Sequence, residues 1–304
     1  MMNISGALQL GFIYSFLALG VFVSFRVMNI PDLTADGSFT LGMSISSLLA
    51  LNGHPLWALV LGMASGAAAG IVTGLLQTKA AIHPILAGIL TMTGLYSVNL
   101  FIMGGSPNIS LLGKENLFTL IQGLLPAAGK NGSRLLGLFL LSAAAVCVLA
   151  WFFRTGLGLR IRAAGNNEQM VRSSSINTDL MRITALALAN ALIAFSGAVL
   201  AQYQGYGDIN AGTGIVIIGL ASVILGELLP FRISPGLSLA SAALGAVAYR
   251  ILIASALYFN VFPAYMFRLL SACIVALALS APALRRIYDG LLRRKRNKQH
   301  AGPH

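Results

Sequence analysis

The residues of this sequence that could do chemistry are a few polar side chains inside long apolar stretches. Ionisable and amide groups in such surroundings are costly and suggest a function by default. Arg250 and Arg268 carry guanidinium groups, which suit a carboxylate, although they could also extend outward to water or pair with Asp208. The candidates for contact with a small polar solute are Asp36, Ser38, Thr40, Asn190, Gln202, Arg250 and Arg268.

Acidic residues flank two of the shorter apolar segments. Asp36 precedes the segment that starts at Ser38, where its carboxylate could cap a helix start or line a path for a solute. Glu227 stands at the end of another segment and is expected to form a local ion pair with Arg232. For Asp36 the sequence leaves both alternatives open.

Catalytic motifs are missing from the sequence. The run from Gly123 to Asn131 resembles a phosphate-binding loop, but it has one residue too many between its glycines and an Asn where Ser or Thr should bind magnesium. The histidines make no ligand spacing, and Cys147 and Cys273 lie in apolar stretches as small hydrophobes. We therefore expect no enzymatic activity, no metal site and no cofactor bound by this chain itself.

The composition predicts an integral membrane protein. Of the 304 residues, 57% are hydrophobic and 9% are charged, and the mean hydropathy is +0.82. A soluble domain carries about 25% charged residues, so this chain could not cover a water-facing surface. The net charge of +12 depends on a basic tail, 285–304, without a row of stacking aromatic residues. Its expected partner is the surface of a lipid bilayer and not nucleic acid.

Nine apolar segments predict an all-α, polytopic membrane helix bundle with about nine transmembrane helices, between eight and ten. Two candidates are shorter than the roughly 20 residues that a span needs, and interrupted helices are tolerated where protein or a watery cavity covers the backbone. Residues 1–284 are expected to form the transmembrane domain. The nine segments are 5–25, 38–51, 56–77, 84–103, 135–153, 181–202, 214–229, 236–258 and 264–279.

Basic residues are distributed unevenly over the predicted loops. Cytoplasmic loops carry an excess of Lys and Arg, and nine spans with the C-terminus inside place fifteen of the twenty Lys and Arg residues on the cytoplasmic side. The N-terminus is then outside. The segment 154–181, the most polar internal one, becomes a cytoplasmic loop.

Glycines at i+4 spacing form a small-residue face on the third apolar segment: Gly62, Gly66, Gly70 and Gly74. Faces of this kind let helix backbones approach closely in a membrane. We expect this glycine ladder to pack against another helix rather than to act on a solute.

Six motifs lie along the chain at Asn29–Ser38, Gly156–Asn167, Ser175–Asp179, Ala189–Gly197, Gln202–Asp208 and Ile218–Glu227. Together they resemble ATP-binding cassette permeases of the branched-chain amino acid and ribose importer type, and the resemblance covers about residues 5–284. The pair Gly226-Glu227, with Asp32 and Asp36, is similar to a subgroup that works with lipoprotein-type binding proteins, some of them linked to aromatic amino acid uptake.

The resemblance implies a type II importer permease in a bacterial plasma membrane, with the C-terminus cytoplasmic. The partners it implies are a second copy of the chain, cytoplasmic ATPase subunits that bind the ATP and Mg, and an extracytoplasmic substrate-binding lipoprotein. An amino acid is the favoured solute, and a sugar or a nucleoside is the alternative.

In this family a short cytoplasmic helix seats in a groove of the ATPase. Residues 166–175 fit this helix, with Gly165 supplying a turn before it and Asn166 or Asn167 as its cap. The alternative is a solvated loop that only follows the distribution of basic residues. The implied coupling residues are Gly158, Arg160, Arg162, Ala163, Gly165, Asn166 and Arg172.

Two other functions stay open at this point. An ion-coupled secondary transporter also uses broken helices and polar groups at the middle of the membrane, and a membrane scaffold would transport no solute.

For the longest outer loop, the apolar spacing of 115–125 predicts an amphipathic helix on the outer surface. We expect that helix to help receive the binding protein.

Overall fold

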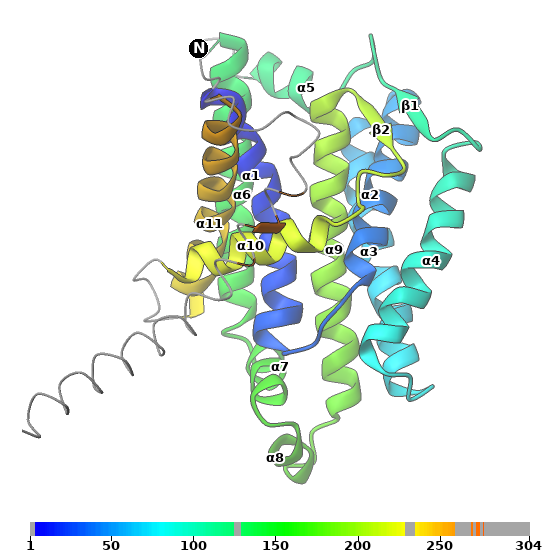
Figure 1. Cartoon of the computed structure of the whole chain (residues 1–304), viewed down its shortest axis with the longest axis vertical. Helices are drawn as coiled ribbons and strands as arrows, with labels where there is room; N and C mark the ends of the chain where they lie inside the picture. Colours follow the sequence, from blue (N-terminus) through cyan, green and yellow to red (C-terminus); the bar gives the residue numbers. More distant parts are fainter. Residues whose placement is uncertain are drawn as a thin grey trace, which may run out of the picture.

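Helices dominate the computed structural model, which describes residues 4–124, 129–228 and 235–258 and four single positions beyond them (Figure 1). The tail 285–304, Arg268, Arg232 and most of 264–279 lie outside the described residues. In chain order the elements are α1 (Ile4–Val21), the π-helix η1 (Phe22–Val27), α2 (Thr34–Leu51), α3 (Pro55–Thr78), α4 (Pro84–Ile102), β1 (Asn108–Ser110), α5 (Leu117–Leu124), α6 (Gly129–Phe152), α7 (Gly156–Asn166), α8 (Glu168–Ser173), α9 (Thr178–Gln204), β2 (Tyr206–Asp208), α10 (Ile215–Glu227) and α11 (Pro235–Tyr258).

Within the described residues, six helices are long and apolar enough to cross a membrane: α1 with η1, α3, α4, α6, α9 and α11. The predicted polytopic helix bundle is confirmed. The predicted number of nine spans is not confirmed, because 38–51 and 214–229 are not among these six helices and 264–279 lies largely outside the described part.

The two short candidates, 38–51 and 214–229, correspond to α2 and α10. α2 starts at Thr34, earlier than predicted, and its 18 residues are mostly buried. α10 has 13 residues, which at 1.5 Å per residue is too short for a hydrocarbon core of about 30 Å. It lies across the bundle, at a steep angle to α1 and α9 (Figure 1). The segment 214–229 is thus a helix inside the bundle and not an upright span.

Local sequence signals set the helix boundaries. Pro55 and Pro84 occupy the first positions of α3 and α4, where a missing N–H costs nothing. Asn177 caps α9, because its side chain accepts a hydrogen bond from the N–H of Leu180 at 3.0 Å. Gly205, with φ of 77°, ends the same helix in the left-handed conformation. These signals delimit α9 as a continuous helix of 27 residues.

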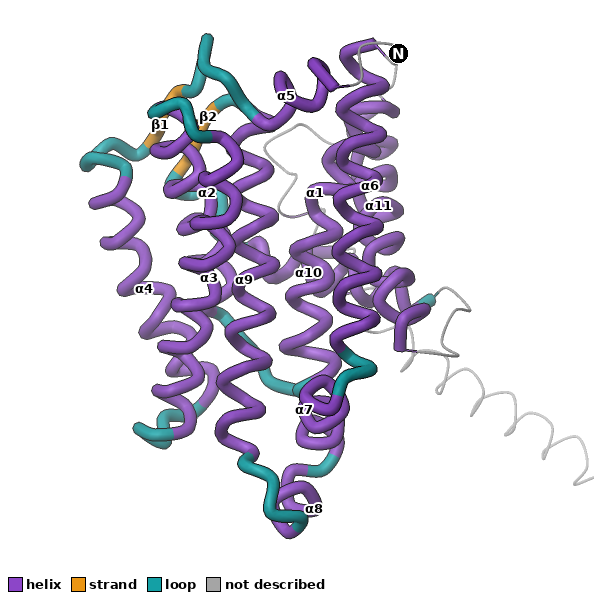
Figure 2. The backbone as a smooth tube through the Cα atoms, turned by 180° about the vertical axis from the view of Figure 1, so that it is seen from behind, coloured by secondary structure: helices purple, strands orange, loops and turns teal. Residues whose placement is uncertain are grey.

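α9 is the central helix of the bundle, packed against α1, α2 and α3 (Figure 2). The glycine ladder of α3 (Gly62, Gly66, Gly70 and Gly74) faces α9 along its whole length. An added methyl at any of the four would overlap with, or press on, the backbone or alanine side chains of α9 or, at Gly74, Ile183. The predicted packing face is confirmed, and α9 is its partner.

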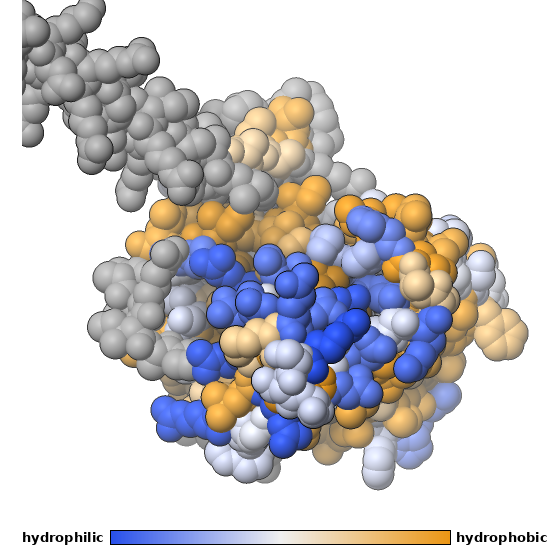
Figure 3. Space-filling model, turned by 90° about the horizontal axis from the view of Figure 1, so that it is seen from below, coloured by the Kyte–Doolittle hydropathy of each residue, from blue (hydrophilic) through white to orange (hydrophobic). Residues whose placement is uncertain are grey.

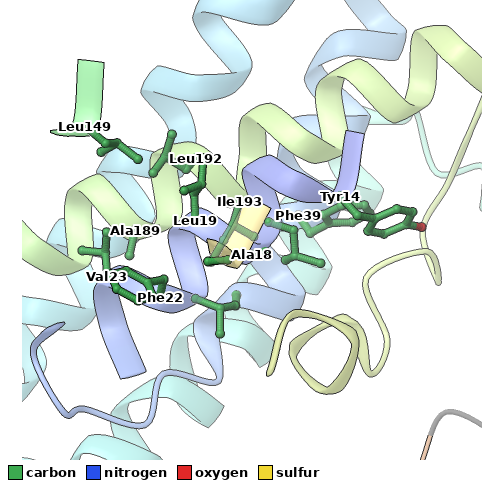
Figure 4. Close-up of a cluster of buried hydrophobic side chains, with 14 of the residues drawn as sticks. Tyr14, Ala18, Leu19, Phe22, Val23, Phe39, Leu149, Ala189, Leu192 and Ile193 are labelled. Atoms are coloured by element: carbon green, nitrogen blue, oxygen red, sulfur yellow. The ribbon is translucent and has the colours of Figure 1, made fainter. Parts of the chain in front are cut away.

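A continuous apolar core joins α1 and η1 to α9, α2 and α6 (Figure 4). Leu19 of α1, Phe39 of α2 and Ile193 of α9 are fully buried in it. Side chains packed at this density keep the long helices in one arrangement. The core therefore fixes where the polar groups on these helices can stand.

The two ends of the bundle differ. At one end, here the α5 end, α5 lies close to the start of α1, and β1 pairs antiparallel with β2, with Ile109 opposite Gly207 (Figure 1). At the other end, here the polar end, α7 and α8 extend beyond the long helices (Figure 1). Viewed from the polar end, a hydrophilic surface is bordered by apolar sides (Figure 3). The two strands were not predicted from the sequence.

Candidate functional site

Asp36, a residue of α2, caps the N-terminus of another helix, α10. It lies in the first turn of α2, and its carboxylate accepts hydrogen bonds from the backbone N–H groups of Gly214 (2.8 Å) and Val216 (3.1 Å). These donors at the start of α10 have no partner within the helix, and a carboxylate is favoured at a helix N-terminus. The structure therefore supports the capping alternative, in a form that joins α2 to α10.

Thr40 and Ser38 lie beside this cap on α2. The Thr40 hydroxyl donates to the carbonyl of Asp36 at 3.1 Å, and Gly212 packs so closely on both that it has no room for a side chain. Ser38 is fully buried, and its hydroxyl has no hydrogen-bond partner among the described residues. Ser38 thus offers an unused polar group within α2, whereas Thr40 is committed to the fold.

Asn190 is paired with a carboxylate that the sequence did not single out as a contact. Its side-chain amide donates to Asp32 Oδ2 at 2.7 Å and to the carbonyl of Leu186 at 3.0 Å. Asp32 is fully buried and also accepts from the N–H of Thr34 at 2.9 Å. Buried carboxylates need such partners, so this pair fastens the loop before α2 to the middle of α9.

Gln202 joins four helices near the α5 end. Its Nε2 donates to Ser46 Oγ (3.1 Å) and to the carbonyl of Pro55 (2.9 Å), and its Oε1 accepts from the N–H of Leu117 (2.7 Å). The amide is buried and engaged on both sides, which favours a structural role. Gln202 also lies twelve residues beyond Asn190 on α9, roughly 18 Å along the helix, so one small solute cannot contact both at once.

Arg250 lies on α11 with its guanidinium 3.7 Å from the ring centroid of Tyr14, in cation–π geometry. Tyr14 in turn stacks on Phe39, with ring centroids 6.3 Å apart. The expected alternative of a pair with Asp208 is not observed, since that carboxylate accepts from the N–H of Asn210. Within the described chain no acid pairs with Arg250, and its Nε is buried without a hydrogen-bond partner.

At the polar end, the segment 154–181 folds into α7 and α8. Thr155 caps α7 by accepting from the N–H of Gly158 at 3.3 Å, and Asn167 caps α8 by accepting from the N–H of Met170 at 3.0 Å. A short helix therefore lies where the sequence indicated one, and Asn167, not Asn166, caps it.

The predicted turn at Gly165 is wrong. Gly165 lies inside α7, and the chain turns at Asn167, which has φ of −152° and ψ of 96°. A side chain at Gly165 would collide with the carbonyl of Val27 and the Cα of Met28. Glycine is required there because α7 touches the end of η1, not because the backbone is left-handed.

Ion pairs fasten α8 to the neighbouring helix ends. Glu168 binds Arg182 (2.9 Å) and Arg172 (3.2 Å), and Asp179 lies 3.9 Å from Arg172 and 3.8 Å from Lys79. Within α8, the side chain of Val171 is buried, whereas that of Met170 is 57% exposed. Of the predicted coupling residues, Arg172 lies in this network, and it connects α8 to the start of α9.

The other predicted coupling residues lie on α7. Gly158 is buried against the backbone of the end of α6, and Arg160 is exposed. Three more line a cavity of about 890 Å³ between η1, α7, α10 and α11: Arg162, Ala163 and Asn166. Glu227 opens onto the same cavity and pairs with Arg26 of η1. Its expected partner, Arg232, lies outside the described residues.

Comparison with known proteins identifies the family. A family model described as branched-chain amino acid transport system, permease component, matches residues 3–279. The chain belongs to this family. It is the permease component of an ATP-binding cassette importer, and its family is one of transport permease components. No solved structure matches the chain significantly.

Individual relatives of this permease differ in what they carry. The tyrosine transport system permease protein of Clostridioides difficile (strain R20291) is 38% identical over 229 residues, 74% of this chain and 73% of the relative. An uncharacterised protein of Rickettsia prowazekii (strain Madrid E) is 32% identical over 221 residues, 73% of this chain and 75% of the relative. The ribose import permease protein of Escherichia coli (strain K12) is 27% identical over 228 residues, 74% of this chain and 68% of the relative.

Proposed function

We propose that this permease forms the translocation path of an importer for an amino acid, with an aromatic one favoured, delivered by an extracytoplasmic binding lipoprotein. Cytoplasmic ATPase subunits would bind the ATP and Mg and drive transport. The observation that carries the proposal is the position of α8, a capped helix held beyond the long helices at the polar end (Figure 1).

The surface of α8 fits a docking role. Buried Val171 and the ion pairs of Glu168 fix the helix from beneath, while exposed Met170 points away from the bundle. An apolar side chain held on a rigid helix is suited to a groove in a partner protein. Arg160 and Arg162, exposed on the neighbouring α7, would meet acidic groups at the rim of such a groove.

The preference for an amino acid rests on the relatives and on Arg250. Similarity to the tyrosine permease, 38%, exceeds that to the ribose permease, 27%. Arg250 has an unpaired Nε within the described chain and lies against the ring of Tyr14, a combination suited to a carboxylate and an aromatic ring. We propose that Arg250 and Ser38 contact the solute and that Asp36, Thr40, Asn190 and Gln202 hold the helices around it; Arg268 lies outside the described residues.

The path would be completed by a second copy of the chain. The polar groups of one chain spread over different levels of α9 and α11 and do not surround one solute. The N-terminus would lie outside the cell and the C-terminus in the cytoplasm, because most of the Lys and Arg residues in the described part of the chain belong to the polar end and the start of α1 lies at the opposite end (Figure 1).

The solute is tested with the co-purified complex of permease, ATPase and binding protein. We expect tyrosine or phenylalanine to stimulate ATP hydrolysis and ribose to leave it at the basal rate. Stimulation by ribose but by no amino acid would overturn the choice of solute and leave the importer intact.

The orientation is tested by labelling single cysteines in a background carrying Cys147→Ala and Cys273→Ala. Asn108→Cys at the α5 end should react with an impermeant maleimide in intact cells, and Ser174→Cys beside α8 should react only after lysis. Both positions are exposed, so access to the side chain is equal. Labelling of Ser174→Cys in intact cells would contradict the orientation and, with it, docking of α8 on a cytoplasmic ATPase.

A further inference from the structure

The cavity at the polar end contains an ion pair that connects η1 to α10. Arg26 Nε of η1 lies 2.5 Å from Glu227 Oε1 at the last residue of α10. The Arg26 side chain is 56% exposed and that of Glu227 is 24% exposed. An ion pair this open to solvent contributes little to stability. Stability therefore does not explain its position.

Glu227 is the last residue of α10 and so stands at the C-terminus of a helix. The C-terminus of a helix carries partial negative charge, so an acidic residue is disfavoured there and a basic one is favoured. Glu227 occupies that disfavoured position on α10, within reach of a cation that belongs to another element. The arrangement ties the end of α10 to η1, which a neutral residue at 227 would not do.

α7 is in direct backbone contact with η1. Gly165 leaves no space between α7 and the Val27 carbonyl, and buried Ile161 and Ala164 line the same side of α7. α7 is also joined to the end of α6, through the Thr155 cap and the close fit of Gly158. A displacement of α7 must therefore displace the end of η1.

η1 is a π-helical turn, wider than the α-helix it continues. Its hydrogen bonds span five residues, as in Met28 N–H to the Val23 carbonyl at 3.1 Å, and π-helical turns of this kind are rare and concentrated at functional sites. Arg26 lies on this turn and makes the ion pair with α10, next to Val27, whose carbonyl is in contact with α7.

α10 is held at both ends by side chains of other elements. Asp36 holds its first residues to α2, and Arg26 holds its last residue to η1. Its 13 residues lie across the bundle between these two points (Figure 1). The end of α10 also packs closely on α11, where Gly226 and Gly245 leave no room for a side chain, so a shift of η1 would move the end of α10 together with α11.

We propose that the Arg26–Glu227 pair transmits the movement of α7 to α10, so that it links ATPase closure to the helix that crosses the middle of the bundle. This inference rests on the proposed docking of α7 and α8 on the ATPase. Arg26 and Glu227 are positioning residues, since neither needs to touch the solute or the nucleotide.

The test uses the complete complex in proteoliposomes with four variants: Arg26→Gln, Glu227→Gln, the exchange Arg26→Glu with Glu227→Arg, and Arg154→Gln as control. Arg154→Gln removes the same charge from the same end, at an exposed position outside the cavity. Three quantities are measured: assembly of the complex, basal ATP hydrolysis, and solute transported per ATP hydrolysed in the presence of loaded binding protein.

Both single Gln variants should assemble and keep basal hydrolysis, while solute transported per ATP falls by up to about fivefold, the largest effect expected of an exposed ion pair and the lower end of typical coupling factors between linked sites. The exchanged pair should restore at least half of the loss, and Arg154→Gln should behave as the parent. Parent-like coupling in both single variants, or no recovery in the exchanged pair, would overturn the inference. Loss of assembly in the single variants would also overturn it, because the pair would then be part of the docking surface. A parent complex whose hydrolysis ignores loaded binding protein would instead refute the proposed function.

Discussion

Replacing Asp36 with Asn should loosen α10 without unfolding the bundle. The carboxylate accepts from two backbone N–H groups, of Gly214 and Val216. Asn keeps one accepting oxygen and turns an N–H group toward the other donor. One hydrogen bond to a charged group contributes about 1.5–3 kcal/mol, and the lost charge at the helix N-terminus adds about 0.3–1 kcal/mol. The local opening of α10 should therefore become about 2–4 kcal/mol easier.

Amide hydrogen exchange followed by mass spectrometry measures this opening. A factor of ten corresponds to about 1.4 kcal/mol, so the exchange of peptides from 215–227 should accelerate roughly 30- to 700-fold where it follows local opening. The matched control is Asp208→Asn, which makes the same chemical change at a carboxylate that accepts from the N–H of Asn210, two residues along the chain. Equal exchange of α10 in the two variants would refute the claim that Asp36 holds this helix.

Three further predictions concern the packing of the glycines in α3 and the surfaces at the two ends of the bundle. Gly70→Ala should destabilise the bundle by about 1–3 kcal/mol, since the added methyl meets the backbone of α9. Gly94→Ala on α4, where no atom lies within 4 Å of the added methyl, should not destabilise it. Equal thermal stability of the two variants would contradict the packing of α3 on α9. Leu112→Glu, at a position 87% exposed in the loop between β1 and α5, should weaken the binding protein's affinity roughly tenfold, which corresponds to about 1.4 kcal/mol from one interface anchor. Surface binding measures this, and unchanged affinity would remove this loop from the receiving surface. Met170→Glu should abolish co-purification of the ATPase while the permease still inserts, and normal recovery of the ATPase would argue against docking of α8.

Features that depend on local sequence could be predicted. The glycine ladder of α3 follows from the spacing of small residues along one segment. The short helix at 168–173 was expected from the family resemblance, and an Asn before it follows the usual preference for a cap. The predicted start of α2 is too late, because the serines and threonines of this helix lower its apolar character. They are tolerated because the helix is buried inside the bundle. Gly165 was misjudged because a glycine in a polar segment suggests a turn, whereas here the reason is the close approach of another backbone.

Contacts between distant segments could not be predicted in the same way. Asn190 and Asp32 are 158 residues apart, and Asp36 caps a helix about 180 residues away. The pair Arg26–Glu227 likewise joins the end of η1 to the end of α10. Period and composition carry no information on which helix ends meet, because that depends on how the whole bundle packs. These long-range pairs were found only from the three-dimensional arrangement.

The most direct test of the account is solute accumulation by proteoliposomes containing the purified permease and ATPase, with loaded binding protein outside. ATP enclosed in the vesicles should drive accumulation of an aromatic amino acid, and dissipating proton and sodium gradients with ionophores should leave the rate unchanged. Accumulation driven by an imposed ion gradient without ATP would contradict the central claim that this chain is the membrane subunit of an ATP-driven importer.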